Sequence, residues 1–173
     1  MDIEEIEKYL LALNDKLKVR NVLGELGICG GAAMCLVFKA RVSTKDIDGI
    51  FCPTQEIRQA IKEISNENNL PEDWLNDGVK GFFHGDPPKQ EVREYSNLRI
   101  WSPSAEYMLA MKCVSARYDS MDGEDIEFLL KHLNIKDKDT VFNIICKYYP
   151  ENSVPVKTKF VIEEIFTRLR QDS

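Results

Sequence analysis

The stretch ELGICGGAAMCLVF, residues 25–38, joins an apolar run to a glycine pair and a helix-forming segment. Residues 25–29 form a short apolar run that predicts a buried strand, and the run ends at the glycine pair Gly30-Gly31. Residues 32–38 follow with strong helix formers and no helix breaker, which predicts a helix. A strand, a glycine turn and a helix in this order allow backbone N–H groups to meet a phosphate. The stretch therefore predicts an α/β unit suited to a phosphorylated ligand.

Two aspartates follow in the stretch RVSTKDID, residues 41–48. We expect residues 44–52 to form a strand, on which Asp46 and Asp48 point to the same side. Two neighbouring carboxylates repel each other unless a cation lies between them. Carboxylate oxygens suit Mg²⁺ or Mn²⁺, and protein-bound Mg²⁺ is the usual partner of substrate phosphates. The sequence thus predicts a metal and nucleotide site with both aspartates as metal ligands.

Length and composition limit the class of protein. The 173 residues, 43% of them hydrophobic, are enough for one compact domain, or for one core with a helical extension. The formal net charge of −6 argues against binding nucleic acid over the whole surface, so any RNA contact has to be local. No apolar run approaches the roughly 20 residues that span a bilayer. Because the acidic, amphipathic start does not resemble a secretory signal, we expect a cytoplasmic protein with no membrane contact.

The five cysteines are scattered among apolar neighbours, and their odd number argues against a complete disulfide framework. We expect them to be buried, reduced thiols, and neither histidine has zinc-ligand spacing with a cysteine. These residues are Cys29, Cys35, Cys52, Cys113 and Cys146.

Periodicity and capping signals divide the rest of the chain. They predict an α+β fold, with an α/β core in residues 1–102 and a helical region, residues 103–173, packed on that core. Thr54 and Ser102 are the expected N-caps of the helices that follow them. The expected helices are 2–17, 54–66, 103–117, 122–132, 137–149 and 155–170, with a helical turn at 71–78 and a hairpin or bent strand at 91–95 and 98–101.

Three motifs carry a resemblance to a known family. GGAAM at 30–34 and RxxTKDID at 41–48 resemble the glycine pair and DxD motif of the polymerase-β-like nucleotidyltransferase superfamily. LAMKCxxAR at 109–117, followed by Asp122 and Asp125, is similar to a narrower branch of small bacterial nucleotidyltransferase-like proteins. That branch includes toxins of toxin–antitoxin and abortive-infection systems. The similar elements extend from about residue 30 to residue 130.

The resemblance implies roles for the matching residues. It implies that a Mg²⁺- or Mn²⁺-bound nucleoside triphosphate is the substrate and that Asp46 and Asp48 are both metal ligands and catalytic residues. It also implies that Lys112 contacts phosphate or assists at the acceptor, with Asp122 or Asp125 as the acid of the last motif. The positions implied for nucleotide binding are Gly30, Gly31, Arg41, Thr44, Lys45 and Asp122.

Structural explanations compete with several of these roles. Arg41 and Lys45 are either phosphate-steering cations or solvated charges. Lys112 is either functional or a surface lysine with a buried stem. Asp122 is also placed to be the N-cap of the next helix, and Asp125 to complete that cap.

The sequence also departs from the family pattern at two points. Many superfamily members have Gly-Ser where this chain has Gly30-Gly31, so a hydroxyl is absent at the second position. A third metal-binding carboxylate is expected on a neighbouring strand, and its candidates are Asp77, Glu91 and Glu94.

Three functional hypotheses follow. The first is a nucleotidyltransferase that modifies a tRNA, another RNA or a protein, as a toxin-like or defence-related member. The second is a catalytically weak or inactive module of the same fold, which docks a protein partner such as an antitoxin through its helical half. The third is an enzyme that modifies a sugar or an antibiotic, and it differs from the first only in the acceptor.

Overall fold

The computed structural model describes residues 1–117 and 121–171. The chain forms two compact units. The first comprises Met1–Gly81 and Lys89–Pro103, and the second comprises Phe82–Pro88 and Ser104–Ser173. Phe82–Pro88 therefore belongs to the second unit, although it precedes the boundary that the sequence suggested after residue 102.

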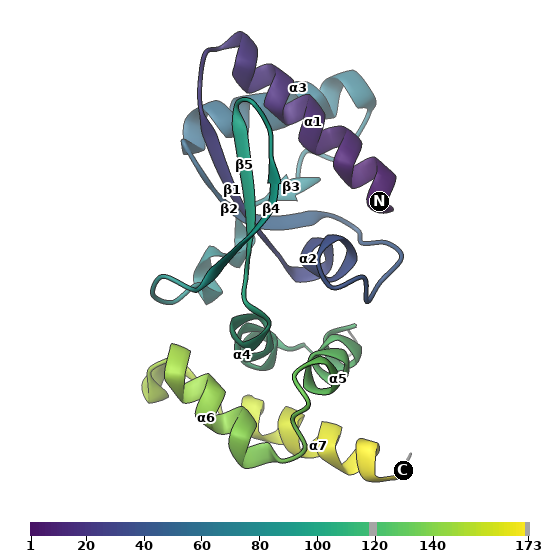
Figure 1. Cartoon of the computed structure of the whole chain (residues 1–173), viewed down its shortest axis with the longest axis vertical. Helices are drawn as coiled ribbons and strands as arrows, with labels where there is room; N and C mark the ends of the chain where they lie inside the picture. Colours follow the sequence, from purple (N-terminus) through teal and green to yellow (C-terminus); the bar gives the residue numbers. More distant parts are fainter. Residues whose placement is uncertain (118–120, 172–173) are drawn as a thin grey trace. The chain divides into compact units, whose positions relative to one another are not determined.

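The first unit is built on a five-stranded sheet with strand order β3-β2-β1-β5-β4 (Figure 1). The central strand β1 pairs in antiparallel fashion with β2 and in parallel with β5. The sheet is therefore mixed and the fold is α+β, as the sequence predicted. The strands are β1 (Gly24–Cys29), β2 (Ile47–Cys52), β3 (Leu75–Asn76), β4 (Lys89–Glu94) and β5 (Leu98–Pro103).

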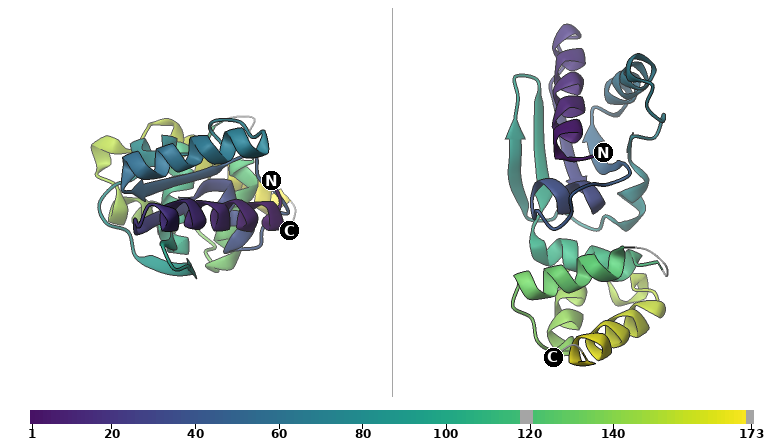
Figure 2. Two further views of the ribbon diagram at one scale, coloured as in Figure 1. Left: turned by 90° about the horizontal axis from the view of Figure 1, so that it is seen from above. Right: turned by 90° about the vertical axis from the view of Figure 1, so that its right-hand side faces the viewer.

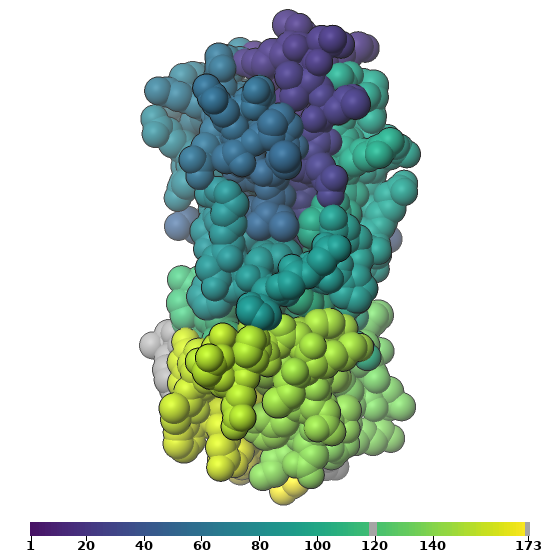
Figure 3. Space-filling view, turned by 90° about the vertical axis from the view of Figure 1, so that its left-hand side faces the viewer, coloured from purple at the N-terminus to yellow at the C-terminus, as the bar shows by residue number. Residues whose placement is uncertain are grey.

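Two helices, α1 (Ile3–Val19) and α3 (Thr54–Asn68), run side by side on one face of this sheet (Figure 2). A Cβ atom on Gly24 would lie 2.6 Å from Leu17 Cδ1 and 3.4 Å from Ile57 Cδ1, so both helices cover the face to which that position points. The outer side of α3 is polar and forms part of the surface of this unit (blue in Figure 3). The amphipathic first helix predicted from the sequence is confirmed.

The opposite face of the sheet carries Asp48. Because side chains alternate along a strand, Gly27 and Cys29 of β1 point away from α1 and α3. Asp48 pairs with Cys29 and Trp101 pairs with Gly27, so both share this second face. Helix α2 (Gly30–Leu36) begins directly where β1 ends.

Several boundaries in the first unit differ from the predictions. Strand β2 begins at Ile47 and not at residue 44, so the preceding loop lies outside the ladder. Residues 71–78 do not form a helical turn. They contain β3, which pairs with the start of β2, and are followed by a 3₁₀ helix, Gly78–Phe82. Helix α3 has Pro53 as its N-cap, while Thr54 donates its hydroxyl hydrogen to the Phe51 carbonyl.

The hairpin of β4 and β5 is confirmed, with an irregularity in the pairing between Glu91 and Arg93. Strand β5 continues to Pro103, one residue beyond the expected cap at Ser102. Ser104 caps the next helix, α4 (Ala105–Ser115), instead, because its hydroxyl accepts a hydrogen bond from the Tyr107 backbone N–H at 3.3 Å.

In the second unit, the regular elements among the described residues are all helical. Helix α4 packs against α5, α6 and α7. The tyrosine hydroxyl of Tyr107 donates to the His84 carbonyl at 2.9 Å and accepts from its N–H at 2.8 Å. Tyr149 donates to the Phe82 carbonyl at 2.6 Å, so buried tyrosines hold Phe82–Pro88 within this unit. The helices are α4 (Ala105–Ser115), α5 (Asp122–His132), α6 (Lys138–Tyr148), the 3₁₀ helix η2 (Glu151–Ser153) and α7 (Lys157–Gln171).

The five cysteines all lie in the described part of the chain. Cys52 and Cys146 are exposed, so the expectation that all five are buried was wrong for these two. Burial raises the pKa of the Cys113 thiol to about 12, which leaves it protonated and unreactive at neutral pH. Within residues 1–117 and 121–171, no helix has the length and apolar character needed to cross a bilayer.

Candidate functional site

The glycine turn lies directly against Asp48. Gly30, the first residue of α2, has a φ of +55°, in the left-handed region that favours glycine. A Cβ atom at this position would lie only 2.6 Å from Asp48 Oδ2. Asp48 is fixed there by strand pairing, since it stands opposite Cys29 on β1 and beside Asn76 on β3. The fold therefore brings together the glycine pair and one aspartate of the DxD motif.

Gly31 is covered by two polar side chains from the loop before β2. A Cβ atom on Gly31 would lie 2.2 Å from Thr44 Oγ1 and 3.6 Å from Arg41 Nη1. A hydroxyl and a guanidinium group therefore occupy the space above this residue. Together with the Asp48 carboxylate, they supply a hydrogen-bonding hydroxyl, a cation suited to phosphate oxygens and a hard anionic ligand.

Asp46 is placed differently from the expectation. It lies in a bend one residue before β2, so the alternation of side chains along a strand does not determine its direction. Its backbone carbonyl accepts a hydrogen bond from Thr44 Oγ1 at 3.2 Å. The prediction that Asp46 lies on the same strand as Asp48 is therefore wrong, because the strand begins only at Ile47. Lys45, in the same bend, is exposed.

The third motif forms a compact ionic cluster in the second unit. Lys112 Nζ lies 2.9 Å from Asp122 Oδ1 and 2.8 Å from Asp125 Oδ2. Lys112 and Asp125 are only 8% and 2% exposed, so the explanation of Lys112 as a surface lysine is wrong. Asp122 is the first residue of α5 and not its N-cap, and its Oδ2 accepts from the Arg117 N–H at 3.2 Å. The cluster joins α4 to α5.

The predicted site residues thus fall into two groups. Gly30, Gly31, Arg41, Thr44, Lys45, Asp46 and Asp48 belong to the first unit, whereas Lys112, Asp122 and Asp125 belong to the second. Asp48 with the two glycines forms one local arrangement, and the lysine with its two aspartates forms another.

The candidates for a third metal-binding acid are engaged or exposed. Asp77 follows β3 and accepts hydrogen bonds from Lys80 at 2.6 Å and Arg58 at 2.8 Å. Glu94 pairs with Arg99 at 3.0 Å. Glu91, on β4, is exposed. Among the described residues, no group of three or more histidine, cysteine or acidic side chains is arranged to hold a metal ion.

The ion pairs of Asp77 predict a specific pH dependence. The hydrogen bond from Lys80 lowers the pKa of Asp77 most strongly; burial opposes this, and the bond from Arg58 adds to the lowering. Since the folded pKa lies below the unfolded value of about 3.9, the contribution to stability is present above that pH and disappears as the pH falls through the folded pKa. The free energy of unfolding of the wild-type protein should therefore decrease as the pH falls below about 4. In Asp77→Asn, this decrease should be smaller.

The comparison requires urea unfolding of wild-type protein and Asp77→Asn at neutral pH and at several values below pH 4. The exposed neighbour Asp73 supplies the control Asp73→Asn, which removes a carboxylate from the other side of β3. Equal acid sensitivity in wild type and Asp77→Asn, with both still folded, would contradict the expectation.

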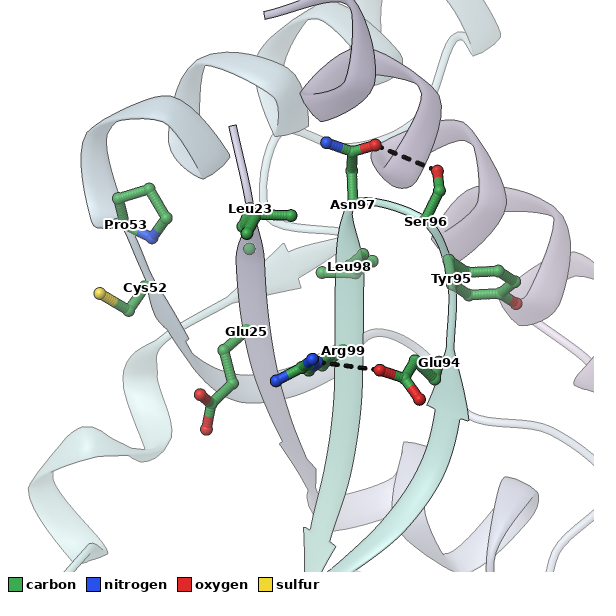
Figure 4. Close-up of a pocket in the computed structure, with 11 residues that line it drawn as sticks. Leu23, Glu25, Cys52, Pro53, Glu94, Tyr95, Ser96, Asn97, Leu98 and Arg99 are labelled. Carbon is green, nitrogen blue, oxygen red and sulfur yellow. Dashed lines mark hydrogen bonds and ion pairs between the residues drawn. The ribbon is translucent and has the colours of Figure 1, made fainter. Parts of the chain in front are cut away.

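A surface hollow lies at the other end of the same sheet (Figure 4). Its volume is about 300 Å³, and Glu25, Cys52 and Arg99 are among the residues that line it. In the ladder of β1 and β2, Glu25 pairs with Cys52 and Cys29 pairs with Asp48. These two pairs are four residues apart, so the hollow and Asp48 are separated by about 13 Å along the strand. Glu94, a candidate for the third metal-binding acid, is among the residues that line it, and the other predicted site residues are not among its described lining residues. Sequence reasoning did not single out this hollow, because charges at alternate strand positions form no motif.

Comparison of the chain with models of protein families, with curated proteins and with solved structures found no match.

Proposed function

We propose that this chain is a Mg²⁺-dependent nucleotidyltransferase, with a nucleotidyltransferase core in its first unit. It transfers a nucleotide from a nucleoside triphosphate to an RNA or protein acceptor. The observation that carries the proposal is the contact between Asp48 and the glycine turn, with Thr44 and Arg41 above the second glycine. One segment, residues 41–48, thus supplies a carboxylate, a hydroxyl and a cation around two glycines that lie ten residues earlier in the sequence.

The residues present fit a hard divalent cation. Asp48 offers a half-buried carboxylate, and Asp46 offers a second from the adjoining bend. Oxygen ligands of this kind are those that Mg²⁺ and Mn²⁺ prefer, so these two side chains would hold the ion. When bound, the ion would neutralise negative charge on the phosphates and orient them for transfer.

The other residues act on the nucleotide directly. Because Gly30 and Gly31 carry no side chains, the Asp48 carboxylate and the Thr44 hydroxyl can lie directly against the turn that would meet a triphosphate. The Arg41 guanidinium can donate two parallel hydrogen bonds to a phosphate. Lys45 adds an exposed positive charge that attracts the nucleotide. Positioning and charge neutralisation are the main requirements of phosphoryl transfer, so this set is chemically coherent.

Lys112, Asp122 and Asp125 support the reaction indirectly in this proposal. The ammonium group of Lys112 already has two carboxylates within 3 Å, and little of its side chain is exposed. These contacts favour a role in holding α4 against α5 over direct contact with phosphate. The helical unit would then carry the acceptor or a partner protein such as an antitoxin.

Two observations favour a second function, that of a binding module with little or no transferase activity. No three-acid metal group occurs in residues 1–117 and 121–171. On β5, the residue that pairs with Gly27 and shares the face of Asp48 is Trp101, not an acid. A chain of this kind could still bind a nucleotide or a protein partner without transferring a nucleotide efficiently.

Two measurements on the wild-type protein separate these functions. In the first, the protein is incubated with each labelled nucleoside triphosphate, Mg²⁺ and either total tRNA or cell lysate. In the second, calorimetry measures triphosphate binding with and without Mg²⁺. We expect Mg²⁺-dependent binding and labelling of one acceptor class. Triphosphate binding without labelling of an acceptor would favour the binding module. If no triphosphate binds in a Mg²⁺-dependent manner, the transferase proposal is overturned.

A further inference from the structure

Thr44 occupies the space that a side chain at position 31 would need. A Cβ atom on Gly31 would lie 2.2 Å from Thr44 Oγ1 and 2.9 Å from Thr44 Cβ. Both distances are below any normal contact between non-bonded heavy atoms, and the neighbour is a short, branched side chain with few alternative rotamers. Position 31 can therefore accept a side chain only if Thr44 moves.

The same hydroxyl also restrains Asp46. Thr44 Oγ1 donates to the Asp46 carbonyl at 3.2 Å, and so closes the bend that precedes β2. The main chain of Thr44 is held as well, since its N–H donates to the Met1 carbonyl at 2.9 Å and the adjacent Ser43 pairs with Asp2. Thr44 thus lies between a fixed backbone on one side and the glycine turn on the other.

Asp46 depends on this restraint more than Asp48 does. Asp48 is held by β2, which pairs with strands on both sides at that residue. Asp46 lies outside the ladder, so the direction of its carboxylate follows the conformation of the bend. A displaced Thr44 would therefore alter Asp46 while leaving Asp48 in register.

We infer that Thr44 is a positioning residue that couples the glycine turn to Asp46, and that residue 31 is glycine because the Thr44 hydroxyl fills its side-chain space. The effect on ligand binding rests on the proposed function, because it assumes that Asp46 helps to hold the cation of a nucleotide complex. The steric coupling between Gly31 and Thr44 does not depend on that function. Two experiments therefore test the two parts separately.

The first experiment measures the coupling by urea unfolding of the full chain. Gly31→Ala is introduced into wild type, into Thr44→Ser and into Thr44→Gly. We expect Gly31→Ala to lower the urea midpoint in wild type and in Thr44→Ser, where the hydroxyl remains. In Thr44→Gly, Gly31→Ala should shift the urea midpoint by less than about half of the shift that it causes in wild type. The reason is that the effects of substitutions at two residues in contact are not additive. An equal shift in all three backgrounds would overturn the steric coupling.

The second experiment measures the binding of Mn²⁺ and a nucleoside triphosphate by calorimetry. Thr44→Val keeps the branched shape without the hydroxyl, whereas Thr44→Ser keeps the hydroxyl. We expect Thr44→Val to weaken binding by about 10- to 100-fold, the usual effect of removing a group that orients a metal ligand. Thr44→Ser and the control Ser43→Ala should stay within about twofold of wild type.

The outcomes of the two experiments are distinguishable. If Thr44→Val binds the metal–triphosphate complex as tightly as the wild-type protein does, the proposed positioning of Asp46 is overturned, even if the steric coupling holds. If wild type binds no metal–triphosphate complex, the proposed function fails and the positioning of Asp46 toward a cation fails with it. The unfolding measurements then still decide whether Gly31 and Thr44 are coupled.

Discussion

Substitution of Asp48 by asparagine is expected to reduce nucleotide transfer by about 10²- to 10³-fold, the usual effect of removing one key electrostatic group from an active site. Asparagine has nearly the same shape and can keep the strand pairing of Asp48 with Cys29 and Asn76. It lacks the negative charge that would bind the divalent ion beside Gly30. The expected loss is therefore chemical rather than structural. Initial rates of label transfer from a triphosphate to the acceptor measure it.

The control for this substitution is Glu72→Gln, which removes an exposed carboxylate from the same unit, ahead of strand β3. It should transfer label at the wild-type rate. Asp46→Asn should also lose activity, because its carboxylate is proposed to bind the same ion. Both aspartate variants should show wild-type thermal unfolding. Undiminished transfer in a folded Asp48→Asn protein would show that the site is misassigned.

Substitution of Lys112 by methionine is expected to lower the free energy of unfolding by about 3–5 kcal/mol, the range found when one partner of a buried ion pair is removed. Methionine fills much of the space of the lysine stem but provides no ammonium group. Two carboxylates, Asp122 and the nearly inaccessible Asp125, would then lose their ion pairs with Lys112. Urea unfolding at neutral pH measures the change.

Two further variants show whether the cluster causes this loss. Lys131→Met changes an exposed lysine on α5 and should alter the free energy of unfolding by less than about 0.5 kcal/mol. Lys112→Met combined with Asp125→Asn should recover part of the stability, because it removes one of the buried negative charges. A loss of less than about 1 kcal/mol in Lys112→Met alone would contradict an essential role for the ion cluster in this unit.

The candidate site was partly predictable because its motifs are local. The glycine pair predicts a turn from two residues, and Gly30 does adopt a positive φ. The contact of Asp48 with that turn is a different matter, since it requires β1 and β2 to pair in one particular register. The position of Asp46 could not be predicted, because nothing local shows that the strand begins at Ile47 rather than three residues earlier. The burial of Lys112 was also missed, since a lysine between apolar residues looks the same whether its ammonium is solvated or paired.

Local patterns were enough to predict the mixture of strands and helices, the first helix with its apolar stripe, and the bounds of α5 at Asp122–His132. These features depend on propensities, periodicity and caps that act over a few residues. Three other features are visible only in the folded chain: Leu75 pairs with Ile47, Phe82–Pro88 belongs to the helical unit, and Thr44 lies against Gly31. Each of these depends on contacts between distant segments, whose free energy comes from burial and pairing that no short window of sequence contains.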